Sequence, residues 1–325
     1  VGHAAMQSPR FLPSNPTSAA LATAGDCFIT KRSSAQRVFC LPGVINIGVQ
    51  KAGTGELQSW LNANPAMLVH GGEAHFFDSV GSFSCQTTRQ QASLRLRYAR
   101  FLWRRRGLLH DELEKHPITF EKTPAYFDLV EPQLIACVVP SVKLLVMLRL
   151  PVARAVSAYR MCQVELKLAW CRRPFETVIE RVLVGSPPRA IRAALQHRPQ
   201  IQRLLMMGQY AQHLSRWLVY FTSSRLRVVW LEQFKSDPFA CMTAIEDYLG
   251  LPNFDYRRVA SRNRAGFWVV GKSKSSSKRP PAFLLGPTGN QTLSNFYEPW
   301  QRRLHLLLKQ HNLSLVAQPE APIGT

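Results

Sequence analysis

A lysine set among glycines is the clearest candidate for anion binding in this chain. Lys51 lies in residues 48–56 (GVQKAGTGE), between a short apolar run and a segment of helical character. Glycines allow successive backbone N–H groups to point at one anion, and the start of the following helix adds the positive end of its dipole. Lys51 precedes the Gly-Thr pair, so the segment does not follow the Walker pattern. The pattern predicts a phosphate-binding turn, with an ordinary strand–helix turn carrying a solvated lysine as the alternative.

A second basic residue follows another apolar run. Arg149 comes directly after residues 143–148, and Pro151 marks the start of a helix. Ser157 lies eight residues after Arg149, about two helical turns. Both side chains can therefore reach one phosphate at the carboxyl end of a strand, where open α/β sheets place ligands. Taken alone, an arginine here is more often a surface cation, and a helical serine often bonds its own backbone.

Two further segments carry groups that could move protons or stabilise charge. Residues 73–78 (EAHFFD) place Glu73 and His75 two residues apart, and a carboxylate with an imidazole can serve proton transfer. The alternative is a loop whose two phenylalanines fill the core. Residues 120–127 (FEKTPAYF) contain Lys122, which could equally be a solvated charge at the end of a strand.

The elements that must position these residues alternate between strand and helix. Short apolar runs predict strands at residues 44–49, 117–120, 143–148 and 226–231. Helical patterns cover residues 56–62, 151–169, 209–221, 238–249 and 293–311. This alternation predicts an α/β fold with a P-loop-like parallel sheet flanked by helices.

The overall charge indicates an acidic partner. The 325 residues contain 41 Lys and Arg against 20 Asp and Glu, a net charge of +21. Such an excess attracts polyanions, and nucleic acid, anionic membrane and acidic polysaccharide all fit it. The seven cysteines show no CxxC and no paired histidine spacing, which argues against structural zinc and allows one or two disulfides.

The ends of the chain have a different composition from its middle. Residues 1–42 are rich in Ser, Ala, Pro and Thr, which predicts a disordered leader or stalk. We expect one domain over residues 43–315 and a flexible tail over residues 316–325. No apolar run approaches the roughly 20 residues that span a bilayer, and a targeting or anchor segment could precede Val1.

The two phosphate-binding candidates together resemble the nucleotide site of sulfotransferases that use 3′-phosphoadenosine 5′-phosphosulfate (PAPS). Residues 47–54, with Trp60-Leu61 and Asn64-Pro65 behind them, resemble the family's 5′-phosphosulfate-binding motif. The resemblance implies that this motif holds the 5′-phosphosulfate and that its lysine stabilises the bridging oxygen; its residues here are Lys51, Ala52, Gly53, Thr54 and Gly55. Arg149 and Ser157 match the 3′-phosphate motif, although Leu150 stands where the family usually has Asp.

Three more segments resemble heparan-type carbohydrate sulfotransferases. Residues 73–78 are similar to the segment that carries the catalytic base, which implies that role for Glu73 and proton transfer at His75; the family usually has Lys where this chain has Gly72. Residues 120–127 match a segment whose lysine, here Lys122, lies beside the sulfuryl group. Trp268 and Lys274 align with an aromatic nucleotide contact and a phosphate-covering lysine.

The later lid departs from the family. Ser275-Ser276 replace the family's Gly-Arg, and the family's cysteine-bridged hairpin is missing from this region. The resemblance therefore implies a shortened lid with altered chemistry. It covers about residues 43–312, with the motifs in the family's order.

These observations lead to one working hypothesis about function. The resemblance implies in-line transfer of a sulfuryl group from PAPS to a heparan-sulfate-like or other acidic glycan, without a metal, in the Golgi lumen. We expect no nucleic-acid partner, and membrane contact only through an anchor not present in this chain. A P-loop nucleotide kinase is the alternative enzyme, but the order of a Walker lysine and Mg²⁺-binding residues is missing. A non-catalytic polyanion-binding protein is supported by the charge of +21 alone.

Overall fold

A computed structural model confirms the predicted α/β fold with a parallel sheet. The structure describes residues 9–32, 35–79, 85–104, 108–183, 198–271 and 285–316. Five parallel strands form the central sheet in the order β5-β6-β4-β7-β8, namely β4 (Val44–Gly48), β5 (Met67–Glu73), β6 (Ile118–Lys122), β7 (Lys143–Leu148) and β8 (Leu226–Trp230). β5 and β6 lie on one side of β4, and β7 and β8 lie on the other, so the order in which strands are added changes side at β4. In open α/β sheets, ligands bind beside the carboxyl ends of the strands at such a point.

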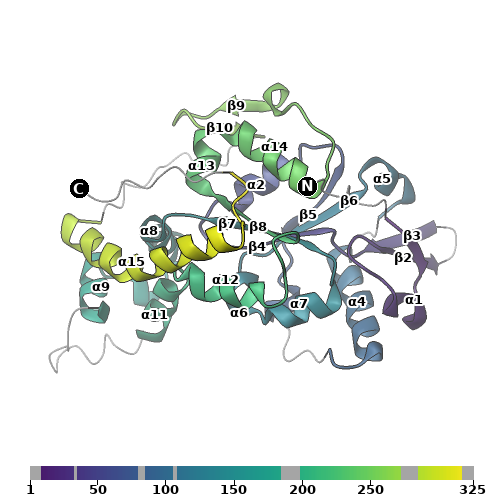
Figure 1. The fold of residues 1–325 in the computed structure, drawn as a ribbon, viewed down its shortest axis with the longest axis horizontal. Coiled ribbons are helices and arrows are strands. Elements are labelled where there is room, and N and C mark those ends of the chain that lie inside the picture. The colour runs from purple at the N-terminus through teal and green to yellow at the C-terminus, as the bar shows by residue number, and fades with distance from the viewer. Residues whose placement is uncertain are drawn as a thin grey trace.

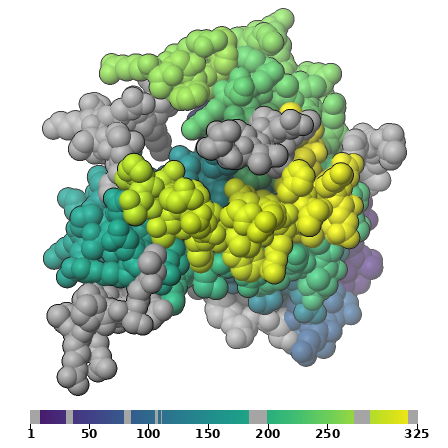
Figure 2. Space-filling model, turned by 60° about the vertical axis from the view of Figure 1, so that its left-hand side comes forward, coloured from purple at the N-terminus to yellow at the C-terminus, as the bar shows by residue number. Residues whose placement is uncertain are grey.

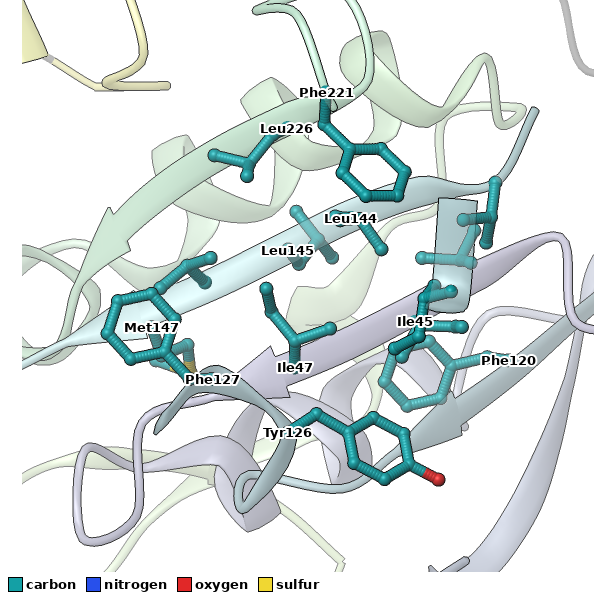
Figure 3. Packing of buried hydrophobic residues seen from close by; sticks show 14 of the residues in the cluster. Ile45, Ile47, Phe120, Tyr126, Phe127, Leu144, Leu145, Met147, Phe221 and Leu226 are labelled. Atoms are coloured by element: carbon teal, nitrogen blue, oxygen red, sulfur yellow. The ribbon is translucent and has the colours of Figure 1, made fainter. Parts of the chain in front are cut away.

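The central strands are apolar because both faces of the sheet are covered. Every residue of β4 and β6 is buried, so neither shows the alternation of a half-exposed strand. In the main core, side chains of β4, β6 and β7 pack with residues that follow β6 and with residues before and at the start of β8 (Figure 3). The residues labelled in Figure 3 are Ile45, Ile47, Phe120, Tyr126, Phe127, Leu144, Leu145, Met147, Phe221 and Leu226.

Helices lie on both sides of the sheet. One side carries α2 (Thr54–Leu61), α13 (Leu231–Ser236) and α14 (Pro238–Leu249), and the other carries α6 (Tyr126–Leu129), α7 (Pro132–Val138) and α12 (Tyr210–Leu218) (Figure 1). The prediction for residues 238–249 is confirmed to the residue. Asp237 accepts a hydrogen bond from the Ala240 N–H at 3.0 Å, and Gly250 ends the helix with a φ of 72°.

A second hydrophobic cluster packs at one end of the molecule. It is built from α8 (Pro151–Arg160), the π-helical turn η1 (Met161–Glu165), the 3₁₀ turn η2 (Ala169–Cys171), α9 (Phe175–Leu183), α11 (Arg198–Met206) and α15 (Pro287–Gln310). The single helix expected over 151–169 is wrong, because the α-helix ends at Arg160 and passes into η1. In the space-filling view α15 crosses one face as a yellow band below α14 and the hairpin of β9 (Ala260–Arg262) and β10 (Trp268–Val270) (Figure 2).

The opposite end of the molecule is formed by the first part of the chain (Figure 1). Here β1 (Phe11–Pro13), β2 (Cys27–Arg32) and β3 (Ala35–Cys40) form a small sheet, and α1 (Pro16–Ala20) packs on α4 (Thr88–Leu102). Arg95 of α4 is buried and donates hydrogen bonds to the carbonyls of Ala19 and Ala20. The expectation of a disordered leader over 1–42 does not hold for β1, α1, β2 and β3. The sequence of this segment alone gave no sign of these elements, because they are stabilised by contacts with α4, which lies far away in the sequence. The boundaries at 43 and 315 stay predictions, and residues 317–325 of the expected tail lie outside the described residues.

Short elements complete the described part of the fold. They are α3 (Phe76–Ser79), α5 (His110–Lys115) and the 3₁₀ turn η4 (Tyr256–Arg258). Three disulfides, one more than the highest number expected, join Cys27 to Cys40, Cys85 to Cys137 and Cys162 to Cys171, and Cys241 is free and buried. Within the described residues, no helix has both the length and the apolar composition needed to span a membrane.

Candidate active site

The turn after β4 has the backbone geometry expected of an anion-binding loop. Lys51 and Gly53 both have positive φ values, 70° and 84°, and α2 begins directly afterwards at Thr54. Gly53 is the N-cap of α2, where glycine adopts the left-handed conformation without steric cost. Gly48 has a different constraint, because a Cβ there would lie 2.6 Å from Cβ of Phe127. At the start of α2, the N–H groups of Glu56 and Leu57 donate to the carbonyl of Gly53, whereas Thr54 and Gly55 line the cavity described below.

Arg149 joins this turn to the end of β7. Its Nη1 donates a hydrogen bond to the carbonyl oxygen of Lys51 at 3.2 Å, and its own carbonyl accepts one from the Tyr210 hydroxyl at 2.8 Å. Burial lowers the pKa of Arg149, although the charge of Glu232 partly offsets this. The guanidinium is thus held at the carboxyl end of the sheet beside the turn.

Glu73 and Lys122 meet where two neighbouring strands end. They are paired in the register of β5 and β6, and the Lys122 Nζ lies 3.0 Å from Glu73 Oε1. The Lys122 side chain is 9% exposed and that of Glu73 is 39% exposed, so the carboxylate is the partner that solvent and an incoming acceptor can reach.

His75 holds the second oxygen of this carboxylate. Its Nε2 lies 3.1 Å from Glu73 Oε2, and its Nδ1 lies 2.7 Å from Asp78 Oδ2. Burial by itself would lower the pKa of His75, but the hydrogen bond to Asp78 and the charges of Asp78 and Glu73 outweigh it and raise the pKa. His75 therefore bridges two carboxylates, and the raised pKa favours the imidazolium form, whose two N–H groups can each donate to one of them.

Sequence reasoning missed the buried groups that support this loop. The Thr123 hydroxyl accepts the N–H groups of Ala74 at 3.0 Å and His75 at 3.3 Å, and donates to Glu121 at 2.9 Å. Glu121 also accepts a hydrogen bond of 2.7 Å from the Tyr98 hydroxyl. Complete burial raises the pKa of Glu121 to about 7, against the effect of these hydrogen bonds. One feature of the sequence could have indicated this role. Consecutive side chains of a strand point to opposite faces of the sheet, so Glu121 must point away from its neighbour Lys122.

A cavity of about 570 Å³ lies at the carboxyl ends of the strands. The cavity brings together eight of the predicted site residues: Lys51, Gly53, Thr54, Gly55, Glu73, Lys122, Arg149 and Trp268. His75 reaches it through Glu73, while Ala52 is fully buried in the turn. Ser157 is half-buried on α8 and does not line the cavity, and Lys274 lies outside the described residues.

The cavity also has lining residues that the sequence motifs did not predict. Lys235 and Phe267 face each other, with Nζ 5.2 Å from the ring centre. Burial and the charge of Arg149 lower the pKa of Lys235, although Glu232 opposes this. A pocket with Lys51, Lys122, Arg149 and Lys235 on its walls, together with three aromatic rings, suits a ligand that carries several anionic groups and a planar base. Its residues therefore fit a nucleotide that carries phosphate groups.

Comparisons with known proteins point to the same class of site. The family model for the sulfotransferase domain matches residues 41–277. Heparan sulfate glucosamine 3-O-sulfotransferase 6 from Mus musculus is 30% identical over 279 residues, which cover 83% of this chain and 72% of that protein. The bifunctional heparan sulfate N-deacetylase/N-sulfotransferase 3 from Homo sapiens is 29% identical, over 82% of this chain and 30% of that protein.

A solved structure gives the same fold. The crystal structure of a sulfotransferase from Alicyclobacillus acidocaldarius matches with a TM-score of 0.54 and 21% identity, over 82% of this chain and 96% of that one. At this identity the likeness concerns the fold. The family match covers most of the chain and spans all the elements around the cavity. The chain therefore belongs to the sulfotransferase family.

Proposed function

We propose that this sulfotransferase moves a sulfuryl group from PAPS to a hydroxyl or amino group of a carbohydrate. The observation that carries the proposal is the single cavity shared by Lys51, Lys122, Arg149 and Glu73, where three cations and one accessible carboxylate converge. When bound, PAPS supplies a sulfuryl group already activated for transfer. No metal is needed in this scheme, because the lysines supply the electrostatic stabilisation.

Each residue has a separate task in this proposal. The turn of residues 51–55 binds the 5′-phosphosulfate with its N–H groups and Lys51, while Arg149 and Ser157 bind the 3′-phosphate. Trp268 packs against the adenine, and Lys274, which lies outside the described residues, is assigned to the phosphates from the sequence resemblance alone. Ser157 is half-buried on α8 and does not line the cavity, so of these residues its role has the least support from the geometry.

The chemical step is assigned to the Glu73 carboxylate and the cations around it. Glu73 accepts the proton of the acceptor hydroxyl or amine while the acceptor oxygen or nitrogen attacks sulfur. The bond between sulfur and the bridging oxygen of PAPS breaks in the same step, and adenosine 3′,5′-bisphosphate leaves. Lys51 and Lys122 stabilise negative charge on the bridging and outer oxygens. His75, held by Asp78 at 2.7 Å, keeps the carboxylate oriented toward the acceptor.

We further propose a heparan-sulfate-like glycan as the acceptor and the Golgi lumen as the site of action. The acceptor is supported by the named activities of relatives about 30% identical and by the net charge of +21. The three disulfides support passage through an oxidising secretory compartment.

The test is transfer of label from ³⁵S-PAPS to a panel of desulfated polysaccharides, with mass analysis of the products. We expect labelled glycan with the natural chain and a strong loss with Lys51→Ala. A parallel reaction with γ-labelled ATP distinguishes a kinase. Phosphorylated product, or glycan binding without any transfer, would contradict the proposal.

A further inference from the structure

One cation on the wall of the cavity has no part in the proposed reaction. Lys235 lies on α13 and lines the cavity, but it belongs to none of the motifs found in the sequence. The start of α13 packs directly on the phosphate-binding turn, because a Cβ at Gly53 would lie 2.5 Å from Cδ1 of Leu231. Lys235 follows Leu231 in the same helix by about one turn, so this contact also fixes the backbone that carries the lysine beside the cavity.

Lys235 has an aromatic ring as one neighbour and a second cation as another. Its Nζ lies 5.2 Å from the centre of the Phe267 ring. The backbone of Phe267 is held by Asn263, whose Oδ1 accepts the Phe267 N–H at 3.1 Å and whose own N–H donates to the Phe267 carbonyl at 2.9 Å. Burial is the main cause that lowers the pKa of Lys235, and the charge of Arg149 lowers it further. The lysine therefore lies within electrostatic reach of the guanidinium assigned to the donor.

The acid that faces these two cations leaves them accessible from the cavity. The charge of Glu232 acts on both Arg149 and Lys235, but Glu232 does not line the cavity. Its Oε1 accepts the N–H of Leu150 at 3.1 Å. Within the part of the chain that the structure describes, neither Arg149 nor Lys235 forms an ion pair. Because two like charges held close together repel each other, an anion bound between them from the cavity side is favoured.

We propose that Lys235 binds the 3′-phosphate of the donor together with Arg149, and thereby selects PAPS over nucleotides that lack this phosphate. The inference rests on the proposed function and adds a residue to the same site. In PAPS only the ribose separates the 3′-phosphate from the adenine, so a ligand of this phosphate should lie near an aromatic wall of the cavity, as Lys235 does beside Phe267. Ser157, which is assigned to the same phosphate, does not line the cavity, whereas Lys235 does.

The test compares two ligands that differ by one phosphate. The probes are adenosine 3′,5′-bisphosphate and adenosine 5′-monophosphate, and calorimetric titration measures the Kd of each. Lys235→Met keeps most of the side-chain length but removes the charge. We expect Kd for the bisphosphate to rise roughly tenfold or more in this variant, and Kd for the monophosphate to change less than about twofold. An equal rise for both ligands, or no rise for the bisphosphate, overturns the inference.

Two further variants separate this contact from the net charge. Lys235→Arg keeps the charge and should retain most of the affinity for the bisphosphate; a variant as weak as Lys235→Met would show that the charge is not the cause. Lys309→Met removes an exposed lysine of α15 that does not line the cavity, so both Kd values should persist. A loss in Lys309→Met equal to that in Lys235→Met overturns the inference.

The natural chain separates failure of this inference from failure of the proposed function. It should bind the bisphosphate more tightly than the monophosphate, because the second phosphate adds charge-assisted hydrogen bonds. A natural chain that binds neither ligand, or both equally, overturns the proposed donor and this inference with it. A preference for the bisphosphate that survives unchanged in Lys235→Met counts against this inference alone.

Discussion

At the residue scale, the orientation of one carboxylate decides whether the site can act as a base. Glu73 has each of its oxygens within 3.1 Å of a nitrogen, from Lys122 on one side and His75 on the other. Glu73→Gln keeps the shape of the side chain but removes its basicity, so we expect kcat to fall by roughly 10²–10³. Steady-state kinetics measures this fall. Glu131→Gln, which alters a carboxylate that is 81% exposed, is the control; turnover near normal in Glu73→Gln would refute the assignment.

His75 makes stability depend on pH in a defined direction. Folding raises its pKa above 6.5, so the folded protein holds this proton more tightly than the unfolded chain. The stabilisation is therefore complete below about pH 6.5 and is lost as the pH rises through the folded pKa. Denaturant titrations should show a free energy of unfolding that falls across this window in the natural chain. His75→Gln should remove that part of the fall, and parallel curves for both proteins would contradict the prediction.

At the element scale, β6 positions both the Lys122 cation in the site and the Thr123 hydroxyl that supports the neighbouring loop. Thr123, at the end of this strand, accepts two N–H groups of the loop that carries Glu73. Thr123→Val keeps the shape but leaves these buried groups unpaired, at a cost of about 1–3 kcal/mol in the free energy of unfolding. We also expect kcat to fall about tenfold or more with KM nearly unchanged, because the loop positions the base. Thr123→Ser restores the hydroxyl and should recover most of kcat; a Ser variant as slow as Val would show that the hydroxyl is not the cause.

The elements differ in how far the sequence could predict them. The strands that end beside Lys122 and Arg149 could be predicted from apolar runs, because a strand that is buried on both faces is apolar along its length. The motif residues around Lys51 were predicted with them, and the cavity joins most of these residues. The support of the Glu73 loop by Thr123 and Glu121 was not predicted, because it depends on which side chains meet across separate elements. The sheet of residues 11–40 was missed for the same reason, since α1 is held by a helix some 75 residues away.

At the scale of the whole molecule, the basic excess and the local charge of the site are separate properties. The net charge of +21 favours encounter with polyanions from any direction. Within the cavity, Lys51 and Arg149 are assigned to the phosphates of the donor, and Lys122 is paired with Glu73 at 3.0 Å. Raising the salt concentration should therefore increase KM for desulfated heparin several-fold and change KM for an uncharged acceptor, the methyl glycoside of N-acetylglucosamine, little. If KM for both acceptors depended equally on the salt concentration, the basic residues would act on the acceptor inside the site and not only during its approach.

Two of the three disulfides close loops of very different length, and these lengths predict the order of their effects on stability. Cys85–Cys137 spans 52 residues and ties the start of α4 to α7, whereas Cys27–Cys40 spans 13 within the small sheet. Because a longer loop restricts the unfolded chain more, removing the first bridge should lower the free energy of unfolding by about 4 kcal/mol and removing the second by about 3 kcal/mol. Paired Cys→Ala variants in urea titrations measure both values. Neither bridge lines the catalytic cavity, so kcat at 25 °C should change little in either variant. A larger loss from the shorter loop would show that native packing of the small sheet, and not loop entropy, sets its contribution.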